Sequence, residues 1–418
     1  MTSTVLDLRT EPMVRRGTHR AALDSGARIV AVHDPTARNV SVSLGLPAGM
    51  RHEAPTEEGM LHLLEHMVYQ DSRSRTASDR EHELDRAAGV LGGHTHLEYT
   101  EFYETGSPGQ LRRICERMVE QVFHPALREE QVASQIRAVA LERATRLSSA
   151  PGGIRPWPHL ATQYWTDHAH GHDGSGDLDL AGRATPERLL ALHRRLYRPA
   201  DSVMTVLTPG DPDAALAIIA ASLSGLSVEC RSAEMPPGPR AVVGRGTDSS
   251  VSVAGARLRR LSVTAAASAR SVDLVGDLLV AEALKDQAGL DASAGLFGPG
   301  DVADDDLFVL VDDTGQGVRA ADRLRALVVS DEVNVGRAAL LALHRAETLI
   351  HDDERLARAT TRDLLLYGAP GFASELVAVL ETASEDERRA RDALRASASR
   401  LANQVFSSLV IEDGGGAP

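Results

Sequence analysis

The five-residue stretch His62-Leu63-Leu64-Glu65-His66 has the residue types best suited to chemistry in this chain. Residues three and four positions apart share one face of an α-helix, so His62, Glu65 and His66 point the same way. Two neutral imidazoles on one helix face can hold a zinc ion, and a carboxylate beside them can take a proton from an attacking water molecule. The spacing therefore predicts a metal centre with a built-in general base.

The motif is short, so it needs support from elsewhere in the chain. His-x-x-Glu-His is the inverted form of the metallopeptidase motif His-Glu-x-x-His. A three-position pattern also arises by chance in a chain with 16 His and 59 acidic residues. The alternative is a plain core helix, because Leu61, Leu64 and Val68 form an apolar stripe about 100° around the helix axis. A third ligand and a matching fold would decide between the two.

Composition narrows the function classes. The 418 residues suggest roughly two to three domains, and 43% hydrophobic with 25% charged residues is typical of a soluble globular protein. A net charge of −14 argues against nucleic acid or an anionic membrane as the main partner. No stretch approaches the 18 or so apolar residues of a membrane span, and residues 1–16 lack the apolar run of a signal peptide. Cys115 and Cys230 are typical of ordinary thiols, so we expect the cytoplasm.

The elements that position the motif alternate between strands and helices in the first half of the chain. Polar and apolar residues alternate over 40–46, which indicates a strand, and helical spacing recurs over 129–147. The predicted strands are a hairpin over 21–33 with its turn at 24–26, then 40–46, 92–103 and 202–207. The predicted helices are the motif helix, 76–90 with Ser78 as its N-cap, 111–123, 129–147, 157–165, 185–197 and 213–223.

A composition break divides the chain, and the second half repeats the pattern of the first. Residues 227–250 contain Pro236-Pro237-Gly238-Pro239 and few apolar runs, which predicts a linker. Segments 191–207 and 388–412 each read as helix, short turn and apolar strand, which favours a duplicated α+β unit. We predict two homologous half-domains, 1–226 and 251–418, each a mixed or antiparallel sheet packed by helices. In the second half we expect strands at 251–258, 261–266, 307–312 and 404–412, and helices at 272–284, 317–327, 338–350 and 388–401.

A second His-rich segment lies at residues 167–177. It contains three His and three Asp among glycines. His residues spaced by two in a flexible loop do not form an ordered ligand set, so the pattern does not favour metal binding there.

Several segments together resemble the pitrilysin/insulinase family of inverted-motif zinc peptidases, in its short bacterial branch similar to the mitochondrial processing peptidase. The resemblance includes residues 24–30, 48–53 before the motif helix, 95–103, and the closing segment 192–206. It implies the α/β-roll fold of these peptidases. The family's third zinc ligand is a Glu about 76 positions after the second His, and Glu142 stands at that distance from His66 (142 − 66 = 76).

The resemblance implies a role for each site residue. His62, His66 and Glu142 would hold one zinc ion per chain, and Glu65 would act as general base and then donate the proton to the leaving amine. Gln135 stands where the family often has a Glu that supports the ligands, and it can still form a hydrogen bond but brings no charge. The implied activity is that of a metallo-endopeptidase acting on peptides, or on precursor or leader segments, inside an enclosed chamber.

The resemblance also assigns substrate-binding residues on the segment from Gly92 to Tyr103. A peptide would add there as an extra strand, contacting Gly92, Gly93, His94, Thr95 and Tyr103. The alternative is an ordinary sheet strand with His94 and His96 on one face. Gly92-Gly93 replaces the family's Asn-Ala, which removes a side-chain contact.

The second half matches the family's Arg and Tyr substrate clamp poorly. Lys285 stands for the Arg, and Ala292 for the Tyr. We therefore expect the chain to be the zinc-bearing subunit of a heterodimer, whose homologous partner supplies Arg and Tyr, rather than a homodimer. The alternative function is a non-catalytic scaffold subunit, which the intact set of zinc-site residues argues against.

Overall fold

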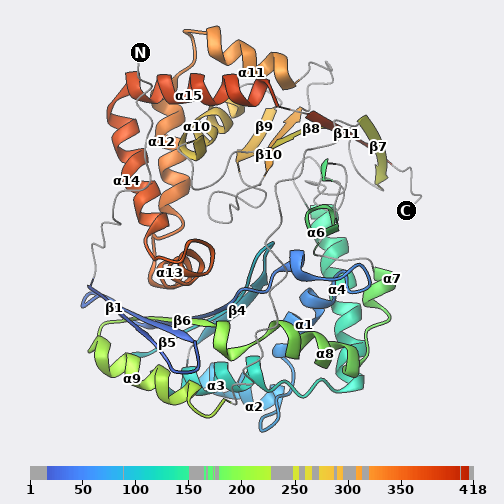
Figure 1. The fold of residues 1–418 in the computed structure, drawn as a ribbon, viewed down its shortest axis with the longest axis vertical. Coiled ribbons are helices and arrows are strands. Elements are labelled where there is room, and N and C mark those ends of the chain that lie inside the picture. The colour runs from blue at the N-terminus through green and yellow to red at the C-terminus, as the bar shows by residue number, and fades with distance from the viewer. Residues whose placement is uncertain are drawn as a thin grey trace.

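Two β-sheets, one from each half of the chain, organise the fold (Figure 1). The computed structural model describes residues 17–87, 89–149, 164–165, 168–172, 174, 178–226, 248–253, 259–265, 273–286, 290–294, 307–312, 320–404 and 406–413. Within these residues the first sheet has the order β1-β2-β6-β3-β5-β4. Its strands are β1 (Gly17–Ala22), β2 (Arg28–His33), β3 (Val40–Leu46), β4 (Val90–Thr95), β5 (Thr100–Gly106) and β6 (Val203–Thr208).

The central strand β3 shows how the sequence builds this sheet. Its apolar residues occupy every second position and face the helical layer, while Ser and Gly residues between them face the opposite side. All seven residues are buried, because helices cover both faces of the sheet. A Cβ atom on Gly45 would lie 2.5 Å from Thr361 Cγ2, so the small side chains of β3 let a helix of the second half pack closely.

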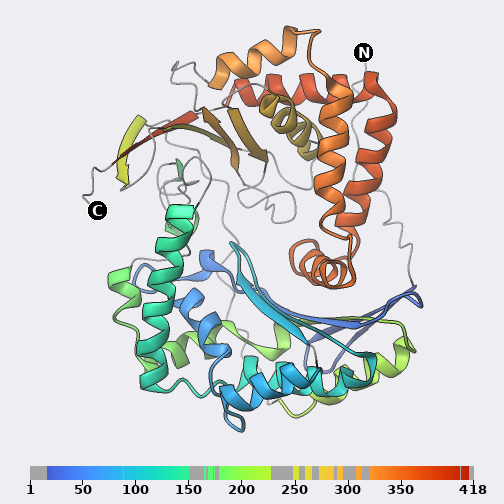
Figure 2. The ribbon, with the colours of Figure 1, turned by 180° about the vertical axis from the view of Figure 1, so that it is seen from behind.

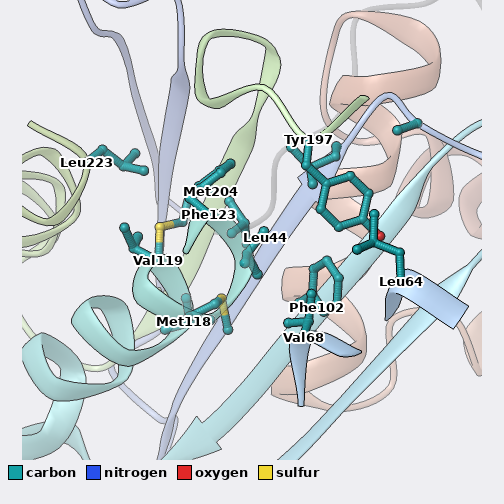
Figure 3. Packing of buried hydrophobic residues seen from close by; sticks show 14 of the residues in the cluster. Leu44, Leu64, Val68, Phe102, Met118, Val119, Phe123, Tyr197, Met204 and Leu223 are labelled. Carbon is teal, nitrogen blue, oxygen red and sulfur yellow. The ribbon is translucent and has the colours of Figure 1, made fainter. Parts of the chain in front are cut away.

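Helices of the first half cover one face of the first sheet. Figure 3 shows Leu64 and Val68 packing against Phe102 and Tyr197 in this core. The motif helix therefore combines an apolar side in the core with a polar side that carries the His and Glu residues. The helices are η1 (Met50–His52), α1 (Met60–Val68), α2 (Ala77–Ala87), η2 (Pro108–Gln110), α3 (Leu111–Phe123), α4 (Glu129–Ser149), α6 (His168–Gly171), α7 (Leu178–Ala181), α8 (Pro186–Leu196), η3 (Pro199–Asp201) and α9 (Pro212–Leu223).

The second sheet repeats the strand order of the first. Its order β7-β11-β8-β10-β9 corresponds to β2-β6-β3-β5-β4, with one parallel pair followed by antiparallel pairs in both sheets. This repetition confirms the predicted α+β fold of two related halves. Its elements are β7 (Asp248–Val253), β8 (Arg259–Ala265), α10 (Asp273–Lys285), β9 (Leu290–Ala294), β10 (Leu307–Asp312), α11 (Ala320–Val329), α12 (Val335–Glu347), α13 (Asp353–Tyr367), α14 (Phe372–Glu385), α15 (Glu387–Ala402) and β11 (Phe406–Asp413).

Helix α13 of the second half packs on the open face of the first sheet, as both views of the ribbon show (Figures 1 and 2). The Arg28 side chain donates a 2.8 Å hydrogen bond to the backbone oxygen of Leu364. Arg358 binds Glu101 of β5, with its Nε 3.0 Å from Glu101 Oε1, and its guanidinium lies 4.0 Å from the centre of the Tyr103 ring. These polar contacts join the two halves at β2 and β5 of the first sheet.

The ion pair between Arg358 and Glu101 predicts an acid-sensitive contact between the halves. Burial alone would raise the pKa of Glu101, but His96 and Arg358 outweigh it and lower that pKa from 4.5 to about 2. Because the folded-state pKa is depressed, this stabilisation is present above pH 4.5 and is lost as the pH falls towards 2. We expect Arg358→Gln to lower the free energy of unfolding by about 3 kcal/mol at pH 7, measured by urea denaturation, because the buried carboxylate loses its partner.

The difference in the free energy of unfolding between Arg358→Gln and wild type should shrink as the pH is lowered from 4.5 towards 2, since Glu101 then becomes neutral in both proteins. Arg355→Gln on the same helix is the matched control, because the Arg355 side chain is 47% exposed. Equal stability of the two variants at pH 7 would show that the ion pair contributes nothing to holding the halves together.

The structure corrects two details of the sequence prediction. The predicted strand 92–103 is a hairpin, since β4 ends at Thr95, the His96 amide donates to Tyr99 O at 2.8 Å, and β5 begins at Thr100. Helix α2 is capped by Thr76 rather than Ser78, because Thr76 Oγ1 accepts the Asp79 amide at 3.1 Å.

Other differences concern elements that were not predicted and predictions that lie outside the described residues. The sequence analysis did not predict β9, α13 or α14. Most of the predicted linker, 227–247, and most of the predicted helix 157–165 lie outside the described residues, and the last three linker positions begin β7. Among the described helices, none alone has the length and apolar composition to cross a membrane, and only the pair α13 and α14, bent by 100°, passes that test when taken together.

Candidate metal centre

Helices α1 and α4 bring the three predicted ligands together. His66 Nε2 lies 3.1 Å from Glu142 Oε2, and His62 Nε2 lies 3.6 Å from the same oxygen. One ligand atom from each residue falls within 4.8 Å of the others, and no other group of His, Cys, Asp or Glu in the described part of the chain meets this test. Two ligands held tetrahedrally at about 2.05 Å from a zinc ion are about 3.3 Å apart, so the two distances from Glu142 to the His residues fit zinc.

The protonation pattern of His66 supports a cation at this point. Gln135 Oε1 lies 3.2 Å from His66 Nδ1, and because an amide oxygen only accepts, Nδ1 carries the proton. The neutral ring then turns an unprotonated Nε2 towards the Glu142 carboxylate, an arrangement that repels unless a proton or a metal ion lies between them. Burial opposes the charged form, but Glu142, Glu65 and Gln135 together raise the pKa of His66 in the metal-free chain.

Gln135 thus contacts His66, one of the three predicted ligands. It fixes the ring orientation of His66 through the nitrogen that faces away from Glu142. The other imidazole has no such support, because His62 Nδ1 is buried and has no hydrogen-bond partner among the described residues. The two His residues are therefore held unequally.

Glu65 lies between the two His residues on α1 but outside the ligand group. Its side chain is buried, with the residue 8% exposed, and its Oε2 accepts a 2.7 Å hydrogen bond from Thr95 Oγ1. Thr95 is the last residue of β4, so its hydroxyl links the predicted general base, Glu65, to the predicted substrate-binding strand. This bond orients the carboxylate.

The glycine pair of β4 makes room for two tyrosine hydroxyls. A Cβ on Gly92 would lie 2.3 Å from the Tyr103 hydroxyl oxygen, and one on Gly93 would lie 2.6 Å from that of Tyr69. The Tyr69 hydroxyl is buried with no hydrogen-bond partner in the described residues, and burial raises the pKa of Tyr69 well above its usual value. A tyrosine hydroxyl thus occupies the space beside each glycine that a larger side chain at that position would need.

One edge of β4 is open in the described sheet. β4 is the last strand in the order and pairs only with β5. Hydrogen-bonded and non-hydrogen-bonded pairs alternate along antiparallel strands, and the His96 amide bonds inward to Tyr99. The amides of Thr95 and Gly93 therefore point away from β5, towards the open edge. His94 is exposed on the intervening position, and its ring centre lies 5.9 Å from that of Tyr103.

Lys285 is not part of the group around His62 and His66. It ends α10 in the second half, and its Nζ lies 2.9 Å from Glu282 Oε1. Glu282 also pairs with Arg345, so the lysine belongs to a local charge network. Its predicted role in substrate binding stays a prediction.

Neither Arg358 nor Glu53 was assigned a functional role from the sequence. Arg358 lies in a helix that the sequence analysis did not predict, and no motif marks it. Glu53 belongs to the segment 48–53 that carried the family resemblance, and its side chain accepts hydrogen bonds from two backbone amides at the start of α1. The position of a carboxylate seven residues before the first residue of a helix was the available signal.

The part of the chain that holds this site matches a known protein family. Residues 28–154, which include α1 and α4, match the family described as Insulinase (Peptidase family M16). This match confirms the resemblance to the insulinase family that the sequence shows.

The chain is also similar to bacterial proteins that are named as zinc proteases. The chain is 28% identical over 203 residues to an uncharacterized zinc protease of Mycobacterium leprae, covering 49% of this chain and 45% of the relative. It is 26% identical over 243 residues to an uncharacterized zinc protease of Streptomyces coelicolor, covering 56% and 51%. The match thus spans about half the length of these relatives.

Solved structures confirm the fold. A protease from Helicobacter pylori superposes with a TM-score of 0.79 at 14% identity, over 95% of this chain and 100% of that chain. A putative M16-like peptidase from Alicyclobacillus acidocaldarius gives a TM-score of 0.70 at 17% identity, over 95% and 99%. At these identities the likeness is one of fold.

Proposed function

We propose that the chain is a zinc metallo-endopeptidase. The observation that carries the proposal is the convergence of His62, His66 and Glu142 with Glu65 placed between the two imidazoles and tied to Thr95. Relatives named as zinc proteases support the same reading. A bound zinc ion would supply Lewis acidity, polarising a peptide carbonyl and acidifying a water molecule.

The chain's own residues carry the proton transfers. Glu65 takes a proton from the attacking water and then delivers it to the nitrogen of the leaving amine. The Thr95 hydroxyl holds the carboxylate in place during both steps. Gln135 keeps the His66 ring turned so that its unprotonated nitrogen stays directed at the zinc site.

The open edge of β4 offers a docking strand for the substrate. A peptide that adds there pairs with outward backbone groups, which gives affinity with little dependence on sequence. Its path runs beside Thr95 and so brings a peptide bond near Glu65. The substrates we propose are peptides, among them precursor or leader segments, bound through their main chain.

The docking strand predicts a specific effect of proline at Gly93. Proline removes the outward amide of residue 93 and leaves the inward bonds of β4 to β5 intact. Because a Cβ there meets the Tyr69 hydroxyl, both Gly93→Pro and its control Gly93→Ala are made in a Tyr69→Phe background. We expect Gly93→Pro to raise the peptide KM about 5-fold over the alanine control, the effect of one lost hydrogen bond. An equal KM in the two variants would exclude docking through this amide.

We further propose that the chain works in the cytoplasm with a homologous partner subunit that encloses the substrate in a chamber. Lys285 is engaged by Glu282, and Ala292 is buried in β9, so neither serves as the Arg and Tyr that the family resemblance implies. A partner chain would supply those groups.

The proposal is tested by hydrolysis of a quenched fluorescent peptide library, with the chain alone and mixed with a homologous chain, and by light scattering of the mixture. We expect activity that a chelator abolishes and zinc restores, and a heterodimer that is more active than either chain. Full activity of the isolated monomer would contradict the partner subunit, and absence of zinc-dependent hydrolysis from both preparations would contradict the peptidase.

A further inference from the structure

The His-rich segment at α6 contacts the chain just before the metal-site helix. His172 Nε2 lies 3.1 Å from Glu53 Oε2, and His172 Nδ1 lies 2.7 Å from the backbone oxygen of His168. The His168 ring stacks on that of His172 with centres 4.4 Å apart, and its Nε2 lies 3.1 Å from the backbone oxygen of Glu53. Its other nitrogen pairs with Glu58 at 3.2 Å. The contact between His172 and Glu53 joins residues 119 positions apart.

Both nitrogens of the His172 ring face oxygen atoms. A backbone carbonyl only accepts, so Nδ1 donates to the backbone oxygen of His168, and Nε2 pairs with the Glu53 carboxyl group. The pair is shielded from solvent, with side-chain exposures of 3% for His172 and 0% for Glu53. A buried pair of this kind holds its members in one geometry, because separating them leaves a buried polar group without a partner.

The Glu53 side chain, held by His172, also binds backbone amides at the start of α1. Its Oε1 accepts the Leu61 amide at 2.6 Å, and its Oε2 accepts the Gly59 amide at 3.1 Å. Amides in the first turn of a helix have no partner within the helix, and the positive end of the helix dipole favours a carboxylate there. The first of these amides, that of Leu61, belongs to the residue directly before His62.

We propose that His172 is a positioning residue for the metal centre. It holds the Glu53 carboxylate against the first turn of α1, and so fixes the direction in which His62 and His66 face Glu142. The function of the His-rich segment is then to orient a helix from outside the ligand group. This inference deepens the proposed zinc-dependent function and rests on it.

Two substitutions at one position test the proposal. The amide nitrogen of His172→Gln takes the place of Nε2 and keeps the bond to Glu53, whereas that of His172→Asn takes the place of Nδ1 and keeps only the bond to His168. We expect His172→Asn to lose zinc to a chelator about 10-fold more readily than wild type, in the range seen when an outer partner of a ligand is removed. We expect His172→Gln to stay within about 2-fold of wild type. His82→Asn on the exposed surface of α2 is the control.

Hydrogen exchange of the metal-free proteins gives a readout that does not depend on zinc. The amides of Gly59 and Leu61 should exchange faster in His172→Asn than in wild type and His172→Gln, while amides of α3 remain unchanged. Equal zinc retention and equal exchange in the two variants would overturn the proposal. If wild type retains no zinc, the proposed function fails, while the exchange of these two amides still decides whether His172 positions α1.

Discussion

Replacement of Glu65 by Gln is expected to leave zinc bound while lowering kcat for peptide hydrolysis by about 100- to 10,000-fold, the usual range for a general acid–base. Gln has nearly the same shape and still accepts the Thr95 hydroxyl, so the surroundings of the site stay in place. It does not accept a proton from water, and that proton transfer is the step assigned to this carboxylate. Initial rates at saturating peptide, with the zinc content of the same sample, measure both quantities.

The control for this substitution is Glu81→Gln, which alters an exposed carboxylate of α2. Its kcat and zinc content should both match wild type. A Glu65→Gln protein with wild-type kcat would refute the role of Glu65, and one that lost its zinc would show that this carboxylate is a ligand after all.

Replacement of Glu142 by Gln should instead weaken zinc binding, by at least about 100-fold. Partners outside the ligand group already contribute 10- to 100-fold to zinc affinity in metal sites, and Glu142 is the only carboxylate within the ligand group itself. The loss also removes the negative charge that the metal neutralises. Competition with a chromogenic chelator measures the affinity, and peptide hydrolysis should fall with zinc occupancy and recover partly in excess zinc.

Glu130→Gln at the exposed start of α4 is the matched control, since it changes the same helix far from the ligand group. It should bind zinc as wild type does. The same affinity in Glu142→Gln and Glu130→Gln would remove Glu142 from the ligand set, and with it the predicted link between α1 and α4.

The ligand group was predictable because it depends on local periodicity and on a long-range spacing supplied by the family. His62, Glu65 and His66 share a helix face by geometry alone, and Glu142 was identified by its distance from His66 along the chain. Gln135 was identified by the family's spacing, seven positions before Glu142, and the structure places it beside His66. The alternation of β3 likewise predicted a strand that the structure shows with the same bounds.

The contacts that orient the site were not predictable in this way. Arg358 meets Glu101 across 257 positions, and nothing local in either segment marks the pair. The hairpin of β4 and β5 was missed because its turn, His96 to Tyr99, contains none of the Gly, Pro or Asn residues that mark turns. The His-rich segment was recognised, but its partner Glu53 emerged only from the tertiary fold.

The central claim is best tested by measuring the zinc content of the purified chain together with zinc X-ray absorption spectra. We expect one zinc ion per chain, coordinated by two imidazole nitrogens and by oxygen atoms, with no sulfur. A chain that holds no zinc after equilibration with the metal, or a spectrum without two imidazole ligands, would contradict it.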